Sequence, residues 1–147
     1  MCSNEKKGLA AMAFEGEPTV DMREMSPLSL AFLGDGVLEL LVRQRLVAHS
    51  RLLPARLHAE AVRYVSARSQ FKEVQLIEPL LTEQEKAVLH RGKNANKATV
   101  AKHATGEEYS TSTGCECLLG WLYLKGQYAR IEELFEVIMR DFAPGKE

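Results

Sequence analysis

Apolar side chains recur at three- and four-residue spacing along most of the chain, which is the pattern of amphipathic helices rather than of strands. The first such segment follows Ser26 and Pro27, a capping residue and a proline suited to the first helical turn. It continues to about residue 48. A second segment starts at Pro54 and extends to Glu78, because the proline that follows disfavours helical geometry in the residue before it.

A third helix is expected to begin at Thr82. Glu85 stands three residues after it and completes the sequence pattern of a capping box. This helix runs into a basic stretch that ends near residue 94. Residues 95–112 are polar and only weakly periodic, so we expect a partly helical or irregular loop there.

Two more apolar segments complete the chain. Residues 113–125 are strongly apolar, and Gly126 is a suitable C-cap for a helix that ends there. Residues 127–142 have the spacing of an amphipathic last helix. No segment alternates in the manner of a β-strand, so the sequence predicts an all-α fold of five or more helices.

The length of 147 residues is that of one domain with a sizeable core. We expect a flexible N-terminal arm over residues 1–25, the folded domain over residues 26–142 and a short C-terminal tail over residues 143–147. No stretch approaches the roughly 20 apolar residues of a membrane helix, and the first 25 residues lack the apolar run of a signal peptide. The three cysteines cannot all pair, so free thiols and a cytoplasmic location are expected.

The net charge of −1 conceals a segregation of charge along the chain. Residues 43–103 carry twelve Lys and Arg residues against five Asp and Glu residues, whereas the segments on both sides are acidic. A basic middle fits a protein with one surface that faces a polyanion. It also fits an ordinary helix face that happens to be basic.

The sequence Leu-Gly-Asp-Gly at residues 33–36 interrupts an otherwise apolar helix. Each glycine in a helix interior costs about 1 kcal/mol relative to alanine, and a carboxylate among apolar residues has to be desolvated. The two glycines fit a close approach of another backbone to this helix, and the aspartate fits a carboxylate with a chemical role. It also fits an Asp35 that caps a helix or pairs with an arginine. Glu39 lies one turn further along the same helix face. It fits a salt bridge to Arg43 as well as it fits a chemical role beside Asp35.

Glu116 is the only charged residue from Ser112 to Tyr123. A buried glutamate needs a cation, a metal or a hydrogen-bond donor as its partner. Gly120 lies one turn later on the same face and permits a close helix crossing there. Two acids in two apolar, glycine-marked helices suggest that Asp35 and Glu116 form a buried carboxylate pair. Such a pair repels unless it shares a proton or a divalent cation, and its hard oxygen ligands suit Mg²⁺.

Cys115 and Cys117 could be read as a zinc or redox site. At two-residue spacing on a helix, however, the two thiols point about 200° apart and cannot share one metal. We therefore interpret both as small buried hydrophobic residues.

A cluster of basic and amide side chains follows the third helix and is a candidate contact for RNA: Arg91, Lys93, Asn94, Lys97, Lys102 and His103. Gly92 lets the backbone approach a phosphate, the cations supply counter-charge, and an asparagine can reach a ribose 2′-hydroxyl. The same residues also fit a helix C-terminus, where Lys and Arg favour the dipole and Gly or Asn caps. His103 also fits an ordinary surface histidine.

Five motifs resemble one known family. The sequence AFLGDGVLEL at residues 31–40 resembles the signature of the ribonuclease III catalytic domain, and CECLLGWLYL at residues 115–124 resembles that domain's second acidic helix. The sequence LHRGKNA at residues 89–95, together with the total length and the lack of a double-stranded-RNA-binding domain, narrows the resemblance to Mini-ribonuclease III. Residues 65–70 and 109–113 agree with it. The likeness extends from about residue 26 to residue 142.

This resemblance implies an endoribonuclease that cuts double-stranded RNA with Mg²⁺, for which Mn²⁺ can substitute. Asp35 and Glu116 match the family's metal-binding catalytic carboxylates. Ala31 and Thr113 stand where full-length ribonuclease III has two further acidic residues. The set of protein ligands is therefore thin, and water and RNA phosphate would complete it.

The resemblance also implies a homodimer that places two sites across the duplex and cuts both strands. The products would carry 5′-phosphate and 3′-hydroxyl ends, and the implied substrate is the precursor of 23S ribosomal RNA. The basic middle of the chain would then follow the phosphates of A-form RNA, which proteins recognise mainly by shape.

Two other functions compete with this one. The first is a non-catalytic RNA-binding or ribosome-associated helical protein on the same fold, which loss of Asp35 or Glu116 would favour; both residues are present. The second is a helical dimerisation module with no role in nucleic-acid binding, which leaves the basic cluster at residues 91–103 unexplained.

Overall fold

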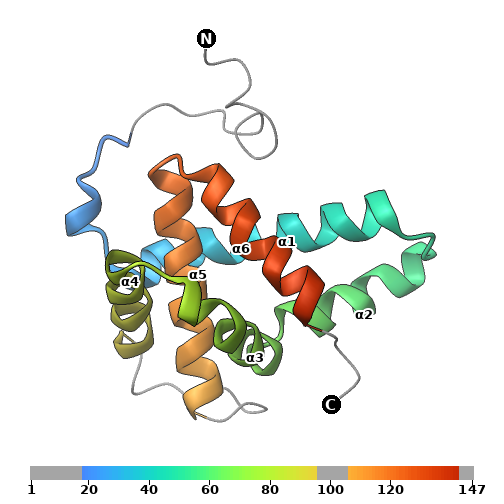
Figure 1. The fold of residues 1–147 in the computed structure, drawn as a ribbon. Coiled ribbons are helices and arrows are strands. Elements are labelled where there is room, and N and C mark those ends of the chain that lie inside the picture. Colours follow the sequence, from blue (N-terminus) through green and yellow to red (C-terminus); the bar gives the residue numbers. More distant parts are fainter. Residues whose placement is uncertain (1–17, 96–105, 143–147) are drawn as a thin grey trace.

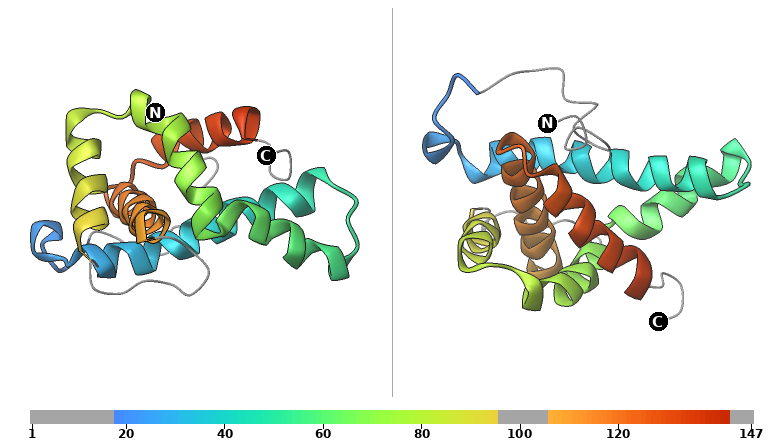
Figure 2. Two further views of the ribbon diagram at one scale, coloured as in Figure 1. Left: turned by 90° about the horizontal axis from the view of Figure 1, so that it is seen from below. Right: turned by 45° about the horizontal axis from the view of Figure 1, so that its top comes forward.

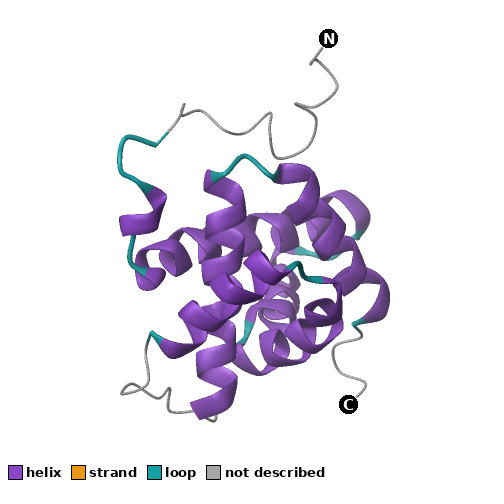
Figure 3. Ribbon diagram, turned by 60° about the vertical axis from the view of Figure 1, so that its left-hand side comes forward, coloured by secondary structure: helices purple, strands orange, loops and turns teal. Residues whose placement is uncertain are grey.

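The computed structural model describes residues 18–95 and 106–142, and this part of the chain consists of helices and loops only (Figure 3). The helices are α1 (Pro27–His49), α2 (Pro54–Val65), α3 (Ala67–Ile77), α4 (Glu83–Asn94), α5 (Gly106–Leu124) and α6 (Tyr128–Asp141), with short 3₁₀ turns at Met22–Glu24 and Glu78–Leu80. The predicted all-α fold is confirmed. None of the described helices is both long enough and apolar enough to cross a membrane.

Helix α5 is the centre of the fold. Seen nearly end-on, it is surrounded by α1, α3 and α4 (Figure 2, left), and its most extensive contacts are with these three helices. Nearly every side chain from Thr111 to Leu122 is buried, Glu116 being the exception. Helices α1 and α2 form a hairpin whose tip extends away from this centre (Figure 1).

The predicted helix starts are confirmed where capping side chains mark them. The Ser26 hydroxyl accepts a hydrogen bond from the Ser29 N–H at 3.1 Å, directly before Pro27 in the first turn of α1. At the start of α4, Thr82 and Glu85 make both hydrogen bonds of the capping box. These contacts satisfy amides at a helix start that have no partner within the helix.

The predicted single helix from Pro54 to Glu78 is wrong, because the chain breaks at Ser66 into α2 and α3. Ser66 has an extended backbone with a ψ of 155°, so the helix cannot continue through it. Its hydroxyl accepts a hydrogen bond from the Ser69 N–H at 3.2 Å and caps the new helix. The break arises because a serine side chain can hydrogen-bond to nearby backbone N–H groups, and this local bond replaces the continuation of the first helix.

Helix α5 begins at Gly106, well before the apolar segment that predicted it. Two of its polar residues, Ser112 and Thr113, are buried, and their hydroxyls donate to the Tyr109 carbonyl at 2.8 and 3.1 Å, which offsets the cost of that burial. Hydroxyls that bond back to the preceding turn need no other partner. The polar stretch from residue 106 is thus helical, while residues 96–105 of the expected loop lie outside the described residues.

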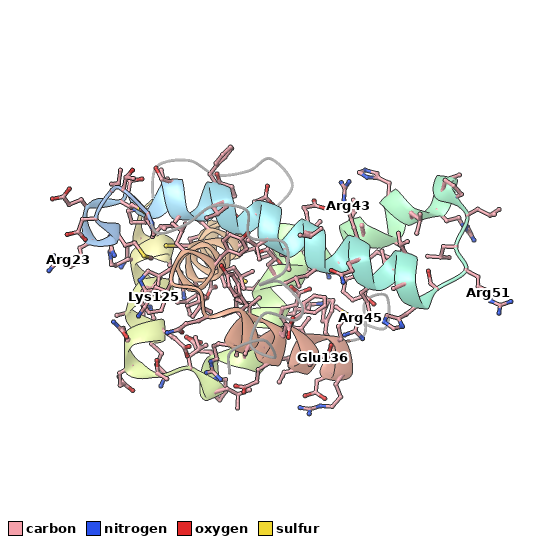
Figure 4. The ribbon with its side chains drawn as sticks, turned by 90° about the horizontal axis from the view of Figure 1, so that it is seen from above. Arg23, Arg43, Arg45, Arg51, Lys125 and Glu136 are labelled. Carbon is pink, nitrogen blue, oxygen red and sulfur yellow. The ribbon has the colours of Figure 1, made fainter. Side chains whose placement is uncertain are left out.

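Two arginines link helix α6 to neighbouring helices, in addition to the apolar side chains that α6 buries. Arg130 of α6 donates two hydrogen bonds of 2.9 Å to the buried Glu85 carboxylate of α4, which lowers the pKa of Glu85. Arg45 of α1 pairs with Glu136 and lies over the Phe135 ring (Figure 4). These contacts fix α6 against α1 and α4, two of the three helices that surround α5.

Candidate active site

Helices α1 and α5 cross in backbone contact at two glycines. A Cβ atom on Gly34 would lie 1.7 Å from the main-chain oxygen of Glu116, and one on Gly120 would lie 2.0 Å from the main-chain oxygen of Leu30. No other residue fits at these two positions without moving a helix. The close crossing expected at Gly120 is confirmed, and its partner on α1 is the glycine directly before Asp35.

The crossing brings the two predicted acids together. Gly34 rests on the main chain of Glu116, so the next residue, Asp35, places its carboxyl group within side-chain hydrogen-bond reach of the Glu116 carboxyl. Burial raises the pKa of Glu116 to about 7, the Gln70 amide opposes this rise, and the neighbouring Asp35 adds to it. Two carboxyl groups in this position favour a shared proton or a bound cation.

The expectation that this pair lies in the apolar interior is wrong for one of its members. Asp35 is exposed, as is Gly36, while Glu116 is only half-buried. Helix α1 is apolar on nearly all sides, and its exposed face includes Phe32 as well as the acid. The apolar residues around Asp35 therefore suggested a buried environment for it. Asp35 in fact lies on the solvent-exposed face of α1, so its carboxylate does not have to be desolvated.

Gln70 of α3 approaches the same carboxylate from the other side. Its side-chain amide donates to the Val65 carbonyl at 2.9 Å and to Glu116 Oε2 at 3.3 Å. The Val65 carbonyl is available because α2 ends at that residue. Glu116 is thus placed between an acid from α1 and an amide from α3.

Sequence reasoning missed Gln70 and Glu73 as functional candidates. Both are 1% exposed, and they share the buried stripe of α3 with Val74 and Ile77. The signal was present, because two polar residues occupy positions of helical spacing that otherwise hold apolar side chains. Burial raises the pKa of Glu73 to about 8, so this carboxyl group is neutral at physiological pH.

The chemistry of this pair fits a magnesium ion. Mg²⁺ commonly binds proteins through one or two carboxylates and completes its shell with water and substrate phosphate. Over the described residues there is no group of three or more His, Cys, Asp or Glu side chains that could enclose a metal. Asp35 and Glu116 therefore offer the open, two-carboxylate type of site rather than a closed structural one.

Three of the predicted RNA-contact residues lie at the end of α4, which packs along α5. Arg91 and Asn94 are exposed and line a shallow groove against the start of α1, together with Leu28. Lys93 is half-buried, and its Cγ atom lies 2.7 Å from where a Cβ on Gly114 would stand. Lys97, Lys102 and His103 lie outside the described residues.

Several alternatives for individual residues can now be decided. Cys115 and Cys117 are buried free thiols, as expected of small hydrophobic residues, and burial raises the pKa of Cys117 to about 11. Glu39 accepts a hydrogen bond from Arg43 at 3.0 Å, which confirms the salt-bridge interpretation. Asp35 caps no helix in the described part of the chain and makes no ion pair there.

The chain is similar in sequence to proteins of one known family. Residues 28–127 match the profile of the ribonuclease III domain. The chain is 41% identical over 113 residues to a Mini-ribonuclease 3 of a Thermoanaerobacter species, covering 77% of this chain and 80% of that protein. It is 43% identical over 112 residues to the Mini-ribonuclease 3 of Symbiobacterium thermophilum, covering 76% and 86%.

A solved structure shares the fold. A crystal structure of a protein from Fusobacterium nucleatum superimposes with a TM-score of 0.74 and 29% identity, over 83% of this chain and 98% of that one. The matched segment contains both the α1–α5 crossing and the two acids that it joins. The chain therefore belongs to the ribonuclease III domain family of endoribonucleases, and within it to the Mini-ribonuclease 3 group.

Proposed function

We propose that this chain is a Mg²⁺-dependent endoribonuclease of double-stranded RNA, in which Asp35 and Glu116 hold the cation and are the catalytic residues. The supporting observation is the glycine crossing of α1 and α5, which puts two carboxyl groups from distant parts of the sequence side by side. Mn²⁺ has the same preference for carboxylate and water ligands and is expected to substitute.

The protein's contribution to the reaction is the placement of these two groups. Glu116 is oriented by the Gln70 amide and by the main-chain contact with Gly34. Asp35 is exposed, so a phosphate on a large duplex can reach it. When bound, the cation supplies the charge that activates a water for in-line attack and stabilises the leaving oxygen. Departure of the 3′ oxygen leaves 5′-phosphate and 3′-hydroxyl ends.

A homodimer is the proposed working form. Phe32 of α1 is 86% exposed, and Leu28, one turn before it on the same face, is 44% exposed. Large apolar side chains at this spacing form a patch of the kind that other proteins cover. Because Asp35 lies one turn beyond Phe32, a partner seated on this patch would lie next to the carboxylate pair. Two such sites can cut the two strands of one duplex.

The proposed natural substrate is the precursor of 23S ribosomal RNA, and the proposed location is the cytoplasm. The resemblance to Mini-ribonuclease III supports this substrate. The two buried free thiols of α5 agree with a reducing compartment.

The basic cluster at the end of α4 is the proposed contact with RNA phosphates. It comprises Arg91, Lys93 and Asn94, together with Lys97, Lys102 and His103 of the segment that follows. Arg91 also acts electrostatically on Cys117, the neighbour of Glu116 on α5, so the end of α4 lies close to the helix that carries the acid. Duplex RNA bound along this cluster would be recognised by its phosphates and 2′-hydroxyls.

Removing two charges from this cluster is expected to weaken RNA binding in a salt-dependent manner. Lys93→Ala with Lys97→Ala should raise the apparent KM for duplex RNA, and the slope of log affinity against log salt should fall by roughly one per lost phosphate contact. The matched control is Arg51→Ala with Arg56→Ala, because Arg51 lies at the tip of the α1–α2 hairpin, away from α4 (Figure 4). Equal slopes in both double variants would contradict the assignment.

The reaction itself is tested by incubating the full chain with long duplex RNA, first with Mg²⁺ and then with EDTA. Fragments with 5′-phosphate ends are expected with Mg²⁺ only, and single-stranded RNA of the same sequence should remain intact. Cleavage that persists in EDTA would contradict the metal dependence. Retention of the duplex without cleavage in either condition would favour the non-catalytic RNA-binding function.

A further inference from the structure

Gln70 and Glu73 of α3 hold buried polar atoms that lack hydrogen-bond partners among the described residues, and Gln70 contacts the carboxylate pair. The Gln70 amide uses both of its N–H groups, one on the Val65 carbonyl and one on Glu116 Oε2. Its own oxygen, Oε1, is buried and accepts no hydrogen bond from any described residue. A buried acceptor without a donor is costly, so a donor is to be sought nearby.

Glu73 stands one helical turn after Gln70 on the same buried face of α3. At this spacing, two side chains on a helix are neighbours. Both carboxyl oxygens of Glu73 are buried, and neither has a hydrogen-bond partner among the described residues. Burial is the main cause that raises the pKa values of Cys115 on α5 and Tyr64 on α2, and Glu73 adds to both rises, so both groups lie near it.

The two unpartnered groups are chemically complementary. Because burial raises the pKa of Glu73 to about 8, the side chain is a neutral carboxylic acid at physiological pH and carries one O–H donor. Gln70 Oε1 is an acceptor that lacks a donor. One hydrogen bond between them would satisfy both, and it would fix the side-chain amide in the orientation that directs Nε2 toward Glu116.

We propose that Glu73 is a positioning residue, whose neutral carboxyl group donates to Gln70 Oε1 and so holds the Gln70 amide against Glu116. This inference rests on the proposed function of Glu116. The relay runs from Glu73 through Gln70 to the carboxylate that holds the cation. Partners of metal ligands orient the ligand in this way, and their loss costs roughly 10–100-fold in metal affinity or activity.

The first experiment compares Glu73→Met with Glu73→Gln in Mg²⁺-dependent cleavage of duplex RNA. Glu73→Met keeps the volume but removes the donor, so we expect kcat to fall about tenfold and half-maximal activity to need more Mg²⁺. The KM for RNA should stay unchanged. Glu73→Gln retains a neutral donor and should keep kcat within about twofold. Equal kcat values in the two variants would overturn the proposal.

Activity per folded molecule separates positioning from a purely structural role. Glu73→Met leaves Gln70 Oε1 buried without its donor, so its free energy of unfolding should fall, and kcat is therefore measured per folded molecule, well below the unfolding transition. A purely structural role predicts an unchanged kcat once only folded molecules are counted, whereas the relay predicts that the tenfold loss persists in fully folded protein. Thr111→Val is the matched control, because Thr111 Oγ1 is also buried without a partner but lies on α5. Its kcat should match the wild type.

The second experiment does not depend on cleavage. The side-chain N–H signals of Gln70 are followed by ¹⁵N NMR in the metal-free protein, together with their hydrogen exchange. Wild type and Glu73→Gln should show slow exchange at similar chemical shifts, and Glu73→Met should show faster exchange. Identical Gln70 signals in all three proteins would overturn the relay. If the signals behave as expected but the wild type cleaves no duplex RNA, the proposed function fails and the contact itself stands.

Discussion

Asp35→Asn is expected to abolish cleavage of duplex RNA while leaving the fold and RNA binding intact. The substitution keeps the size of the side chain and removes one of the two carboxylates proposed to hold Mg²⁺. Loss of a residue that merely orients a metal ligand costs roughly 10–100-fold, so loss of a ligand itself should lower kcat by more than about 100-fold. Single-turnover cleavage at saturating protein measures this effect.

The position of Asp35 makes this a clean test. Its side chain is exposed, so the free energy of unfolding should change by no more than about 0.5 kcal/mol. Duplex affinity, measured without Mg²⁺, should remain near the wild-type value. Glu39→Gln is the matched control, because Glu39 is an acid one turn further along α1 whose partner is Arg43. Full turnover in Asp35→Asn, or an equal loss in Glu39→Gln, would remove Asp35 from the mechanism.

Features whose physical cause is local could be predicted from the sequence. Ser26 with Pro27 and Thr82 with Glu85 mark the starts of α1 and α4, because capping side chains act on amides within three residues. The pairing of Asp35 with Glu116 is not local, yet glycines beside both acids signalled a close approach of two backbones. Resemblance to a known family supplied what these signals alone could not decide.

Errors arose where a polar residue acts against the apolar pattern. The periodicity of residues 54–78 continues through Ser66, but the serine hydroxyl caps a new helix and the chain turns. That break leaves the Val65 carbonyl without a hydrogen-bond donor from its own helix. The Gln70 side-chain amide donates to this carbonyl and also to Glu116 Oε2. A continuous helix would have bonded that carbonyl internally. The mispredicted break therefore belongs to the geometry of the site.

Exposure was harder to predict than proximity. The residues around Asp35 are apolar, but α1 also has apolar residues on its solvent-exposed face, including Phe32, which is 86% exposed. Such a helix has little amphipathic contrast, so its sequence does not show which side faces solvent. Conversely, Glu73 is a charged residue type that usually lies on the surface, but it shares the buried stripe of α3 with Val74 and Ile77.

The α1–α5 crossing should tolerate no side chain at Gly34, and Gly34→Ala is expected to have the largest effect on stability. The new Cβ would lie 1.7 Å from the Glu116 carbonyl oxygen, and this neighbour is backbone that cannot rotate away. Overpacking of a core costs about 1–3 kcal/mol and occasionally more, so we expect a loss of about 3 kcal/mol or more in urea unfolding.

Gly36→Ala is the control that separates this clash from the general effect of alanine in a helix. Gly36 lies two residues away on α1 and has no atom within 4 Å of an added Cβ, so alanine there should stabilise the helix by up to about 1 kcal/mol. Its cleavage rate should be retained. In Gly34→Ala, α1 and α5 must separate and carry Asp35 away from Glu116, and a displacement of about 1 Å costs on the order of 100-fold in rate. Equal free energies of unfolding in the two variants would mean that α1 and α5 can separate without loss of stability. The crossing would then not be the contact that holds the two carboxyl groups together.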